Sequence, residues 1–498
     1  MHTSRVPRAD RRVPAAPLPH RAMRSLRFGA TPLAVALAAA AGLSAAACTP
    51  RADAPAATVA VADSTPAVPL DAHPAWARDA ALYEVNIRQF TPEGTFTALL
   101  PHLARLDSLG VDILWLMPVQ PIGVEGRKGT LGSYYSIKDY RATNPEFGTP
   151  ADLKAVIDSA HALGLKVILD WVANHTARDH PWIAAHPDWY TRRADGTVSN
   201  PRNADGTETD WTDVADLNYG NPAMRAAMID DMAWWVREMG VDGFRCDVAW
   251  GVGMDFWRAA RAALLRERGD LFLLAEAEGA EYHAAFDATY GWALHHLMNQ
   301  LAQGKDSFPS LDTLLAREDR TYPANAMRMM FTSNHDENSW QGTEFERMGD
   351  NHRAMFVLAA TLPGSLPLVY TGQEAGLAKR LRFFEKDTVS WADPSPGAFY
   401  RTLLELKAAT PALWNGADGG DMARLAGSVP ATAYAFTRTE GSSVALVAVN
   451  LGAKPATVRY TGLAAPGAYR DAFSGGTETL AASGTLTLPP HGYRVLTR

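Results

Sequence analysis

The sequence has few cysteines and no excess of positive charge. Only Cys48 and Cys246 occur in 498 residues, which excludes a scaffold built on several disulfides. Residues 1–47 contain seven arginines and one aspartate, which leaves 40 basic and 53 acidic residues, a net charge of −13, for the rest. Such a surface repels phosphate backbones and argues against a nucleic-acid partner. Paired histidines at metal-ligand spacing on one strand are also lacking, which argues against a metal-dependent hydrolase.

The N-terminal region has the composition of an export signal. Residues 28–47 carry no charge, are rich in alanine and leucine, and follow Arg24 and Arg27. A basic region, an apolar run and small residues before a cleavage point are typical of a secretory signal. We therefore predict a signal peptide over residues 1–47; a start at Met23 instead of Met1 would give it the more usual length.

The cysteine after the signal has a specific role in the prediction. Cys48 follows small residues and resembles the lipidated first residue of a bacterial lipoprotein, although Ala45 stands where that motif usually has leucine. We predict an exported protein, held at the bacterial cell envelope (periplasm or cell surface) through a lipid on Cys48; cleavage that leaves a free Cys48 is the alternative. Residues 48–75, rich in Ala, Pro, Thr and Val, then form a flexible tether. If Cys48 is lipidated, Cys246 has no cysteine with which to form a disulfide. We then expect Cys246 to be a buried core residue.

Short apolar strands alternate with amphipathic helices over residues 76–410. Nearly continuous apolar strands separated by helices are typical of parallel strands covered on both faces. Eight such alternations predict a (β/α)8 barrel. The predicted strands lie at 81–87, 111–118, 165–172, 243–249, 271–275, 285–289, 327–333 and 366–370, with helices at 96–109, 150–163, 222–239 and 397–409.

Two regions depart from this alternation. Residues 176–218 are rich in turn-forming residues and tryptophans, which predicts an inserted domain (B domain) after the third strand. Residues 411–498 contain short alternating strands separated by Gly/Pro turns, which predicts a C-terminal antiparallel β-sandwich. The predicted fold class is therefore α/β, a barrel with one insertion and one C-terminal domain.

The fourth predicted strand presents an arginine and an aspartate on one face. Arg245 and Asp247 are two residues apart, so on a strand their side chains point to the same side. A guanidinium favours the ionised form of a neighbouring carboxyl, and an ionised, positioned aspartate can serve as a covalent nucleophile. Taken alone, the same pair could equally be a buried ion pair that stabilises the core.

Other polar side chains follow the remaining strands, where such barrels carry their reactive groups. They are Asp170, Asn174 and His175 after the third strand, Glu276 after the fifth, and His335 and Asp336 after the seventh. Converging carboxylates are unfavourable for stability because they repel one another. Two carboxyls that flank a glycosidic bond, with a third anionic group nearby, are suited to an oxocarbenium-like transition state. The pattern therefore favours glycoside chemistry.

These segments resemble the α-amylase family of glycoside hydrolases. Four ordered motifs of that family are matched by Asp170-Trp171-Val172-Ala173-Asn174-His175, Gly243-Phe244-Arg245-Cys246-Asp247, Leu274-Ala275-Glu276-Ala277-Glu278 and Phe331-Thr332-Ser333-Asn334-His335-Asp336. Val214-Ala215-Asp216-Leu217-Asn218 matches the short motif of the inserted domain. The resemblance extends over residues 80–498.

The resemblance implies a role for each matched residue. Asp247 would be the nucleophile, Glu276 the acid/base and Asp336 the third carboxylate, which binds sugar hydroxyls. Substrate-binding residues would be Tyr135, His175, Arg245 and His335, with Arg245 also keeping Asp247 charged. Tyr134 is an alternative to Tyr135 as the ring on which the sugar stacks, and Asp170 is expected to be a structural hydrogen-bonding residue.

The implied metal site is incomplete in the sequence. Asn174 and Asp216 match calcium ligands of the family, and oxygen ligands suit Ca²⁺. Many members carry a Lys-His pair at the third and fourth positions after the nucleophile, the histidine carbonyl helping to bind calcium. Those positions are Trp250 and Gly251 here. No organic cofactor is implied.

The predicted activity is retaining hydrolysis of α-glucosidic bonds, mainly α-1,4, in starch-type glucans or malto-oligosaccharides. An α-glucosidase, a cyclomaltodextrinase or neopullulanase, or a glucanotransferase of the same family is the nearest alternative. A non-catalytic carbohydrate-binding barrel is a remote one, because such a protein would be expected to lose a catalytic carboxylate.

Overall fold

The computed structural model describes residue 70 and residues 72–498. The predicted signal peptide, Cys48 and most of the predicted tether lie outside the described residues. Eight parallel strands form a closed barrel in the order β1-β10-β9-β8-β7-β6-β3-β2. Their bounds are β1 (Leu82–Val85), β2 (Ile113–Leu116), β3 (Lys166–Val172), β6 (Gly243–Asp247), β7 (Phe272–Ala275), β8 (Ala288–Tyr290), β9 (Met327–Phe331) and β10 (Ser365–Tyr370). The predicted fold class is confirmed.

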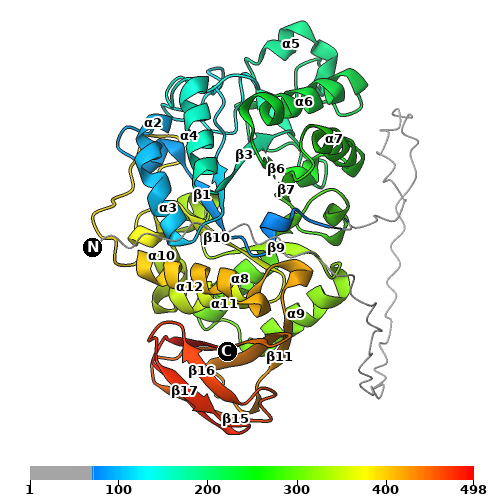
Figure 1. Ribbon diagram of the computed structural model, residues 1–498. Helices are drawn as coiled ribbons and strands as arrows, with labels where there is room; N and C mark the ends of the chain where they lie inside the picture. The colour runs from blue at the N-terminus through cyan, green and yellow to red at the C-terminus, as the bar shows by residue number, and fades with distance from the viewer. Residues whose placement is uncertain (1–69, 71) are drawn as a thin grey trace, which may run out of the picture. The chain divides into compact units, whose positions relative to one another are not determined.

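Helices cover the outside of this barrel (Figure 1). In the described residues they are α1 (Ile87–Phe90), α2 (Phe96–Leu99), α3 (Leu103–Leu109), α4 (Pro150–Ala162), α5 (Pro181–Ala185), α6 (Pro222–Trp234), α7 (Met254–Glu267), α8 (Trp292–Ala302), α9 (Phe308–Thr321), α10 (Glu344–Met348), α11 (His352–Thr361) and α12 (Gly397–Ala409). The helix predicted at 96–109 is divided into α2, a 3₁₀ turn and α3, because Pro101 has no N–H to donate. The helix predicted at 222–239 ends as a wider π turn, Trp235–Met239. None of these helices is long and apolar enough to cross a membrane.

Side chains alternate between the inside of the barrel and the helix layer. Inward residues such as Trp115, Phe272, Tyr290 and Phe331 form one buried cluster. Cys246 belongs to the outer cluster, between the strands and the helices. Because Arg245 and Asp247 are its neighbours on β6, their side chains point the other way, into the barrel.

The insertion lies between β3 and β6. It begins with β4 (His175–Ala177), which pairs antiparallel with β5 (Val214–Asp216), so His175 lies opposite Asp216. Residues between these strands are mostly turns, with the short helix α5. This pairing holds the insertion beside the carboxyl end of β3, where Asn174 and His175 follow the strand.

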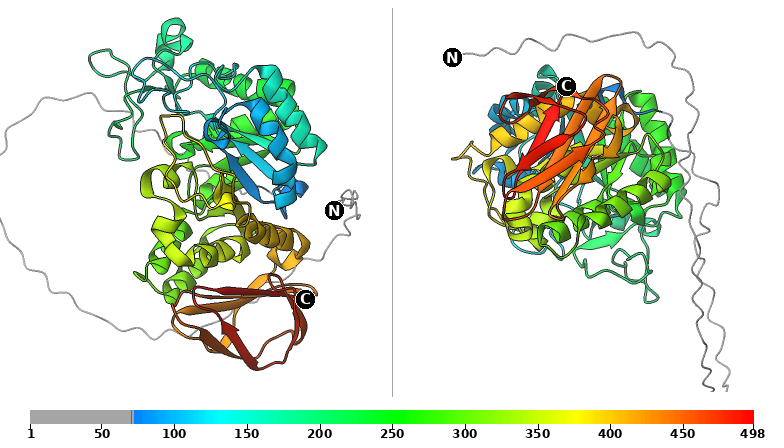
Figure 2. Two further views of the ribbon diagram at one scale, coloured as in Figure 1. Left: turned by 90° about the vertical axis from the view of Figure 1, so that its left-hand side faces the viewer. Right: turned by 90° about the horizontal axis from the view of Figure 1, so that it is seen from below.

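Two antiparallel sheets form the C-terminal region, one of six strands and one of three. In the six-stranded sheet, Tyr434, Phe436 and Val447 join the core shared with the helices, whereas alternate residues pack on the small sheet. The strands of the larger sheet lie side by side in the right-hand view of Figure 2. The six-stranded sheet contains β11 (Asp421–Arg424), β13 (Ala433–Glu440), β14 (Ser443–Asn450), β16 (Gly467–Asp471), β17 (Thr477–Leu480) and β19 (Tyr493–Thr497). The three-stranded sheet contains β12 (Ala426–Ser428), β15 (Ala456–Thr461) and β18 (Gly484–Leu488).

Candidate active site

One buried guanidinium organises the carboxyl end of the barrel. Arg245 Nη1 donates hydrogen bonds to Asp170 Oδ1 and Asp247 Oδ1, each at 2.8 Å. Its Nη2 forms an ion pair with Glu276 Oε1 at 2.8 Å, without the angles of a hydrogen bond. Arg245 is fully buried and does not line the cavity described below. It holds three carboxylates from three strand ends, and its predicted contact with substrate stays a prediction.

Glu276 is also bound by the turn that follows Asp247. Its Oε2 accepts a hydrogen bond from the Val248 N–H at 2.8 Å, and its own N–H donates to the Cys246 carbonyl at 3.0 Å. The backbone after β6 therefore positions the Glu276 side chain. Asp247 Oδ2, in contrast, has no hydrogen-bond partner among the described residues. One oxygen of Asp247 is held by Arg245, and the other makes no hydrogen bond among the described residues.

The two carboxyls influence each other's pKa. Burial raises the pKa of Asp247 and Glu276 raises it further, while Arg245 lowers it, and the net direction is upward. Burial likewise raises the pKa of Glu276; Arg245 lowers it and Asp336 raises it, with a net upward shift. Arg245 thus favours the ionised form of Asp247, as the sequence predicts, but burial and Glu276 outweigh it. Two close carboxyls on one guanidinium bind a first proton more readily than an isolated carboxyl does.

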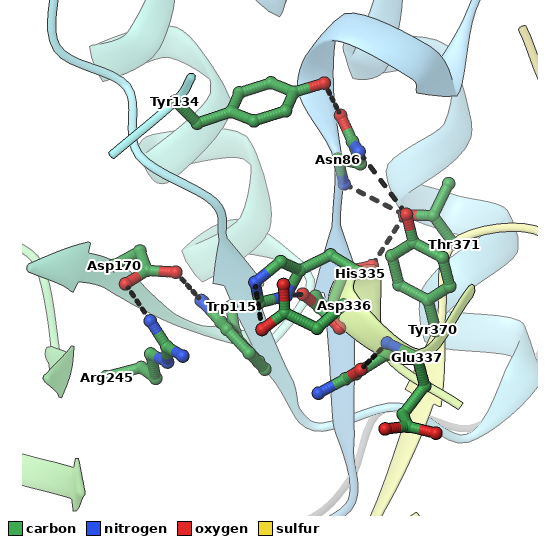
Figure 3. Close-up of polar contacts among 12 residues, drawn as sticks. Asn86, Trp115, Tyr134, Asp170, Arg245, His335, Asp336, Glu337, Tyr370 and Thr371 are labelled. Atoms are coloured by element: carbon green, nitrogen blue, oxygen red, sulfur yellow. Dashed lines mark hydrogen bonds and ion pairs between the residues drawn. The ribbon is translucent and has the colours of Figure 1, made fainter. Parts of the chain in front are cut away.

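His335 and Asp336 follow β9, and Tyr135 connects His335 to Asp170 of the Arg245 cluster. His335 Nδ1 lies 2.5 Å from Glu84 Oε1, and its Nε2 lies 2.8 Å from the Tyr135 hydroxyl and 3.4 Å from Asp336 Oδ2. Figure 3 shows His335 beside Asp336, and Asp170 between Arg245 and Trp115. Glu84 was missed from the sequence, although a charged residue within the apolar strand β1 was a usable signal.

These neighbours charge the imidazole. Burial alone would lower the pKa of His335, but Asp336 and Glu84 outweigh burial and raise it from 6.5 to about 9. Its contribution to stability is therefore fully present below pH 6.5 and is lost as the pH rises through about 9. We expect His335→Gln to destabilise the protein more at about pH 7 than at about pH 10, measured by urea unfolding.

A second buried histidine provides the control for this prediction. Burial lowers the pKa of His295, which lies 2.9 Å from Glu337. The His295 imidazole is therefore neutral over the whole pH range in which His335 loses its charge. His295→Gln should cause a loss that is constant between about pH 7 and about pH 10. An equal loss for His335→Gln at the two pH values would contradict a charged His335.

The structure distinguishes between the two adjacent tyrosines. Tyr135 lines the cavity, stacks on His335 with ring centroids 5.4 Å apart, and donates its hydroxyl to Asp170 Oδ2 at 3.1 Å. Tyr134 is buried elsewhere and donates to Asn86 Oδ1 at 3.0 Å (Figure 3). Asp170 also accepts from Trp115 Nε1 at 3.1 Å, so all its contacts are structural.

The residues predicted for calcium lie at the start of the insertion. The Asn174 amide nitrogen lies 3.2 Å from His175 Nδ1. Partial burial raises the pKa of Asp216 to about 6, although a hydrogen bond with Thr191 and the charge of Arg202 lower it. A half-buried carboxylate can serve as a calcium ligand, yet the described residues contain no group of three or more His, Cys, Asp or Glu side chains that could hold a metal. The remaining oxygen ligands would have to be carbonyls and water.

A cavity of about 750 Å³ joins these groups. Asp247, Glu276 and Asp336 line it together with Tyr135, His175 and His335. Its walls also contain aromatic residues that the sequence analysis did not assign: Trp211, Trp250, Trp292, Trp340, Phe383 and Phe384. They come from the insertion and from segments that follow different strands. Only the folded chain brings them to one cavity, so the sequence alone did not single them out. Burial lowers the pKa of His175 to about 4, which keeps that imidazole neutral beside the cavity.

A closed (β/α)8 barrel with two carboxylates on one guanidinium at its carboxyl ends has the arrangement of a glycoside hydrolase. The family model "Alpha amylase, catalytic domain" matches residues 62–395. The chain therefore belongs to the α-amylase family.

Similar proteins include alpha-amylase MalA of Haloarcula japonica, 32% identical over 451 residues, or 84% of this chain and 63% of MalA. The chain thus spans less than two thirds of that relative. Among solved structures, the maltogenic alpha-amylase AmyB of Thermotoga neapolitana is 28% identical with a TM-score of 0.75, over 84% of this chain and 98% of AmyB. An alpha-amylase of Lactobacillus plantarum is 32% identical with a TM-score of 0.74, over 85% of this chain and 99% of that chain.

Proposed function

We propose that this protein is a retaining glycoside hydrolase that cleaves α-glucosidic bonds, mainly α-1,4, in starch-type glucans or malto-oligosaccharides. The observation that carries the proposal is the pair of carboxylates, Asp247 and Glu276, held on one guanidinium in an aromatic-walled cavity. Aromatic rings pack on the apolar faces of sugars, and carboxylates bind their hydroxyls.

The contacts support a division of roles between the two carboxyls. Asp247 accepts a hydrogen bond from Arg245 and keeps Oδ2 free, which favours the ionised nucleophile at this position. Glu276 then carries the proton of the pair and delivers it to the leaving oxygen as Asp247 attacks the anomeric carbon. In the second step Glu276 takes a proton from water, which attacks the covalent glycosyl-enzyme from the face that the leaving group vacated.

The spacing of the carboxyls favours retention of configuration. Adjacent nitrogens of one guanidinium keep Asp247 and Glu276 close together. Retaining enzymes have carboxyls about 5–5.5 Å apart, whereas inverting enzymes separate them by about 6.5–9.5 Å to admit a water molecule. Asp336, with a side chain 37% exposed beside the charged His335, is placed to bind sugar hydroxyls.

Proton NMR during hydrolysis of maltoheptaose tests the proposal. We expect the first new reducing ends to be α-anomers, before mutarotation. Appearance of β-anomers, or no cleavage of maltoheptaose, starch, pullulan or isomaltose by the folded protein, would contradict it. The distribution of products over these four substrates separates an α-amylase from the α-glucosidase, cyclomaltodextrinase and glucanotransferase alternatives.

We further propose that Asn174 and Asp216 are ligands of a structural calcium ion. The ion would neutralise the half-buried Asp216 carboxylate and hold the insertion on β3; no catalytic step depends on it. We expect added Ca²⁺ to raise Tm and lower the pKa of Asp216, and Asp216→Asn to abolish the rise in Tm. A Tm of the unaltered protein that is the same in calcium and in excess chelator would contradict this proposal.

We also propose that the protein is exported and held at the bacterial cell envelope by a lipid on Cys48. The support is the uncharged run before Cys48 and the small residues that precede it. Mass spectrometry of the mature N-terminal peptide should show a diacylglyceryl cysteine, and Cys48→Ala should move the protein from the membrane fraction to the soluble one. An unmodified Cys48 in the mature protein would contradict lipidation.

A further inference from the structure

A buried glutamate of strand β1 contacts the active site. Side chains alternate along β1, so Glu84 points into the barrel with Leu82, whereas Tyr83 and Val85 face the helices. Glu84 is fully buried, and its Oε1 lies 2.5 Å from His335 Nδ1. Its Oε2 has no hydrogen-bond partner among the described residues. A buried carboxylate with one unpaired oxygen is unfavourable for stability, and such a cost is typical of a functional site.

Glu84 is the first member of a chain of hydrogen bonds that ends at Arg245. His335 Nε2 lies 2.8 Å from the Tyr135 hydroxyl, and that hydroxyl donates to Asp170 Oδ2 at 3.1 Å. Asp170 Oδ1 accepts from Arg245 Nη1 at 2.8 Å. The chain therefore connects β1 to the guanidinium that holds the proposed nucleophile.

Both partners of the His335 ring are hydrogen-bond acceptors. The Tyr135 hydroxyl gives its one proton to Asp170, so toward Nε2 it can only accept. On the other side of the ring, an ionised Glu84 has only acceptor oxygens. A neutral imidazole has a single N–H and satisfies one of these partners, whereas a doubly protonated ring satisfies both. The geometry therefore requires a charged His335.

The charged groups around the ring agree with this requirement. Burial lowers the pKa of His335, but Asp336 and Glu84 outweigh burial and raise it to about 9, although Arg245 lowers it. Burial raises the pKa of Glu84, while His335 and Arg245 lower it, and the net direction is upward. The charged and titratable groups that face the ring are Glu84 on β1, Tyr135 after β2, Asp170 on β3, Arg245 on β6, Glu276 after β7 and Asp336 after β9.

We propose that Glu84 is a positioning residue of the reaction, which keeps both ring nitrogens of His335 protonated so that Nε2 donates to Tyr135. The Tyr135 hydroxyl is thereby held on Asp170. The same Nε2 faces Asp336 Oδ2, 3.4 Å away on the cavity wall. A ring without the Nε2 proton would instead accept from Tyr135 and turn that hydroxyl away from Asp170. This inference rests on the proposed function, because it assigns a role within the same site.

The substrate α-maltosyl fluoride isolates this effect. Fluoride leaves without a proton, so kcat/KM on this substrate does not need the acid form of Glu276 and reports the His335 proton instead. In the unaltered protein we expect kcat/KM to fall as the pH rises through about 9. Glu84→Gln keeps the size of the side chain, removes its charge and offers an amide that can donate as well as accept. We expect the fall to begin about one pH unit lower or more in this variant, with kcat/KM about tenfold below that of the unaltered protein at about pH 8.

Glu84→Asp makes the opposite change, because it keeps the charge and shortens the side chain. It should lower Tm through the cavity that it leaves, but retain the pH profile of the unaltered protein. Glu374→Gln is the matched control. Glu374 is also a buried glutamate with an unpaired oxygen, but it pairs with Arg105 at 2.8 Å and accepts from Tyr83. Its replacement should lower Tm without moving the pH profile.

Nitrogen-15 NMR of the histidine side chains gives a readout that does not depend on turnover. The His335 signals, assigned by their absence in His335→Gln, should show two protonated ring nitrogens at about pH 7 in the unaltered protein and in Glu84→Asp, and a neutral ring in Glu84→Gln. A neutral ring in the unaltered protein would overturn the proposal even if Glu84→Gln does not fold.

The pH profiles can overturn it as well. An unchanged profile in Glu84→Gln, or a shift in Glu84→Asp as large as that in Glu84→Gln, would show that the charge of Glu84 does not act on the reaction. If the unaltered protein cleaves neither α-maltosyl fluoride nor maltoheptaose, the proposed function itself fails.

Discussion

Asp247→Asn is expected to lower kcat on malto-oligosaccharides by about 10⁴-fold or more. The amide has nearly the same shape and can still accept the hydrogen bond that Arg245 now donates to Oδ1 at 2.8 Å. It cannot attack the anomeric carbon, because an amide oxygen is a poor nucleophile. The variant should fold, since Arg245 keeps the Asp170 and Glu276 carboxylates as partners.

The measurement is single-turnover and steady-state hydrolysis of maltoheptaose, with Tm as the test of folding. Asp213→Asn is a matched control, because Asp213 lines the same cavity but pairs with Lys128 at 3.3 Å, away from Arg245. Asp213→Asn should keep most of the activity. A folded Asp247→Asn variant with near-normal turnover would disprove the nucleophile assignment.

Glu276→Gln is expected to show a loss that depends on the leaving group. Without the acid, turnover of malto-oligosaccharides should fall about 10²- to 10⁴-fold, whereas formation of the glycosyl-enzyme from α-maltosyl fluoride should persist because fluoride leaves without a proton. Hydrolysis of that intermediate stays slow, since the same residue is the base. Added azide should then accelerate turnover and give an α-maltosyl azide of retained configuration.

The pH profile gives a second measurement on this variant. The raised pKa of the carboxyl pair means that the acid form is lost as the pH rises through that value, so kcat/KM of the unaltered protein should fall on the basic side. That basic limb should disappear in Glu276→Gln.

Glu278→Gln is the control for this prediction. Glu278 also lines the cavity, but it forms an ion pair with Arg328 at 2.6 Å. Its replacement should leave both the rate of hydrolysis and the pH profile nearly unchanged. Equal losses on maltoheptaose and on the fluoride in the first chemical step would contradict Glu276 as the acid.

Much of the fold was readable because its signals are local. Apolar strands that recur between amphipathic helices predicted the barrel, and the break in that alternation predicted the insertion between β3 and β6. The two-residue spacing of Arg245 and Asp247 predicted their contact on one face of β6. The boundaries were less predictable where one residue overrides the pattern, as Pro101 does in the first long helix.

The sequence by itself determined the order of strands and helices, the identity of the carboxylates at the strand ends and the direction of each strand side chain, because all three follow from short-range backbone geometry. Only the tertiary structure decided that Glu84 of β1 charges His335, which follows β9, that Tyr135 and not Tyr134 faces the cavity, and that Arg245 is shared by three carboxylates. Those outcomes depend on closure of the barrel, which brings together residues far apart in the chain. Burial there also reverses a local expectation, since it raises the pKa of Asp247 against the pull of its own neighbour, Arg245.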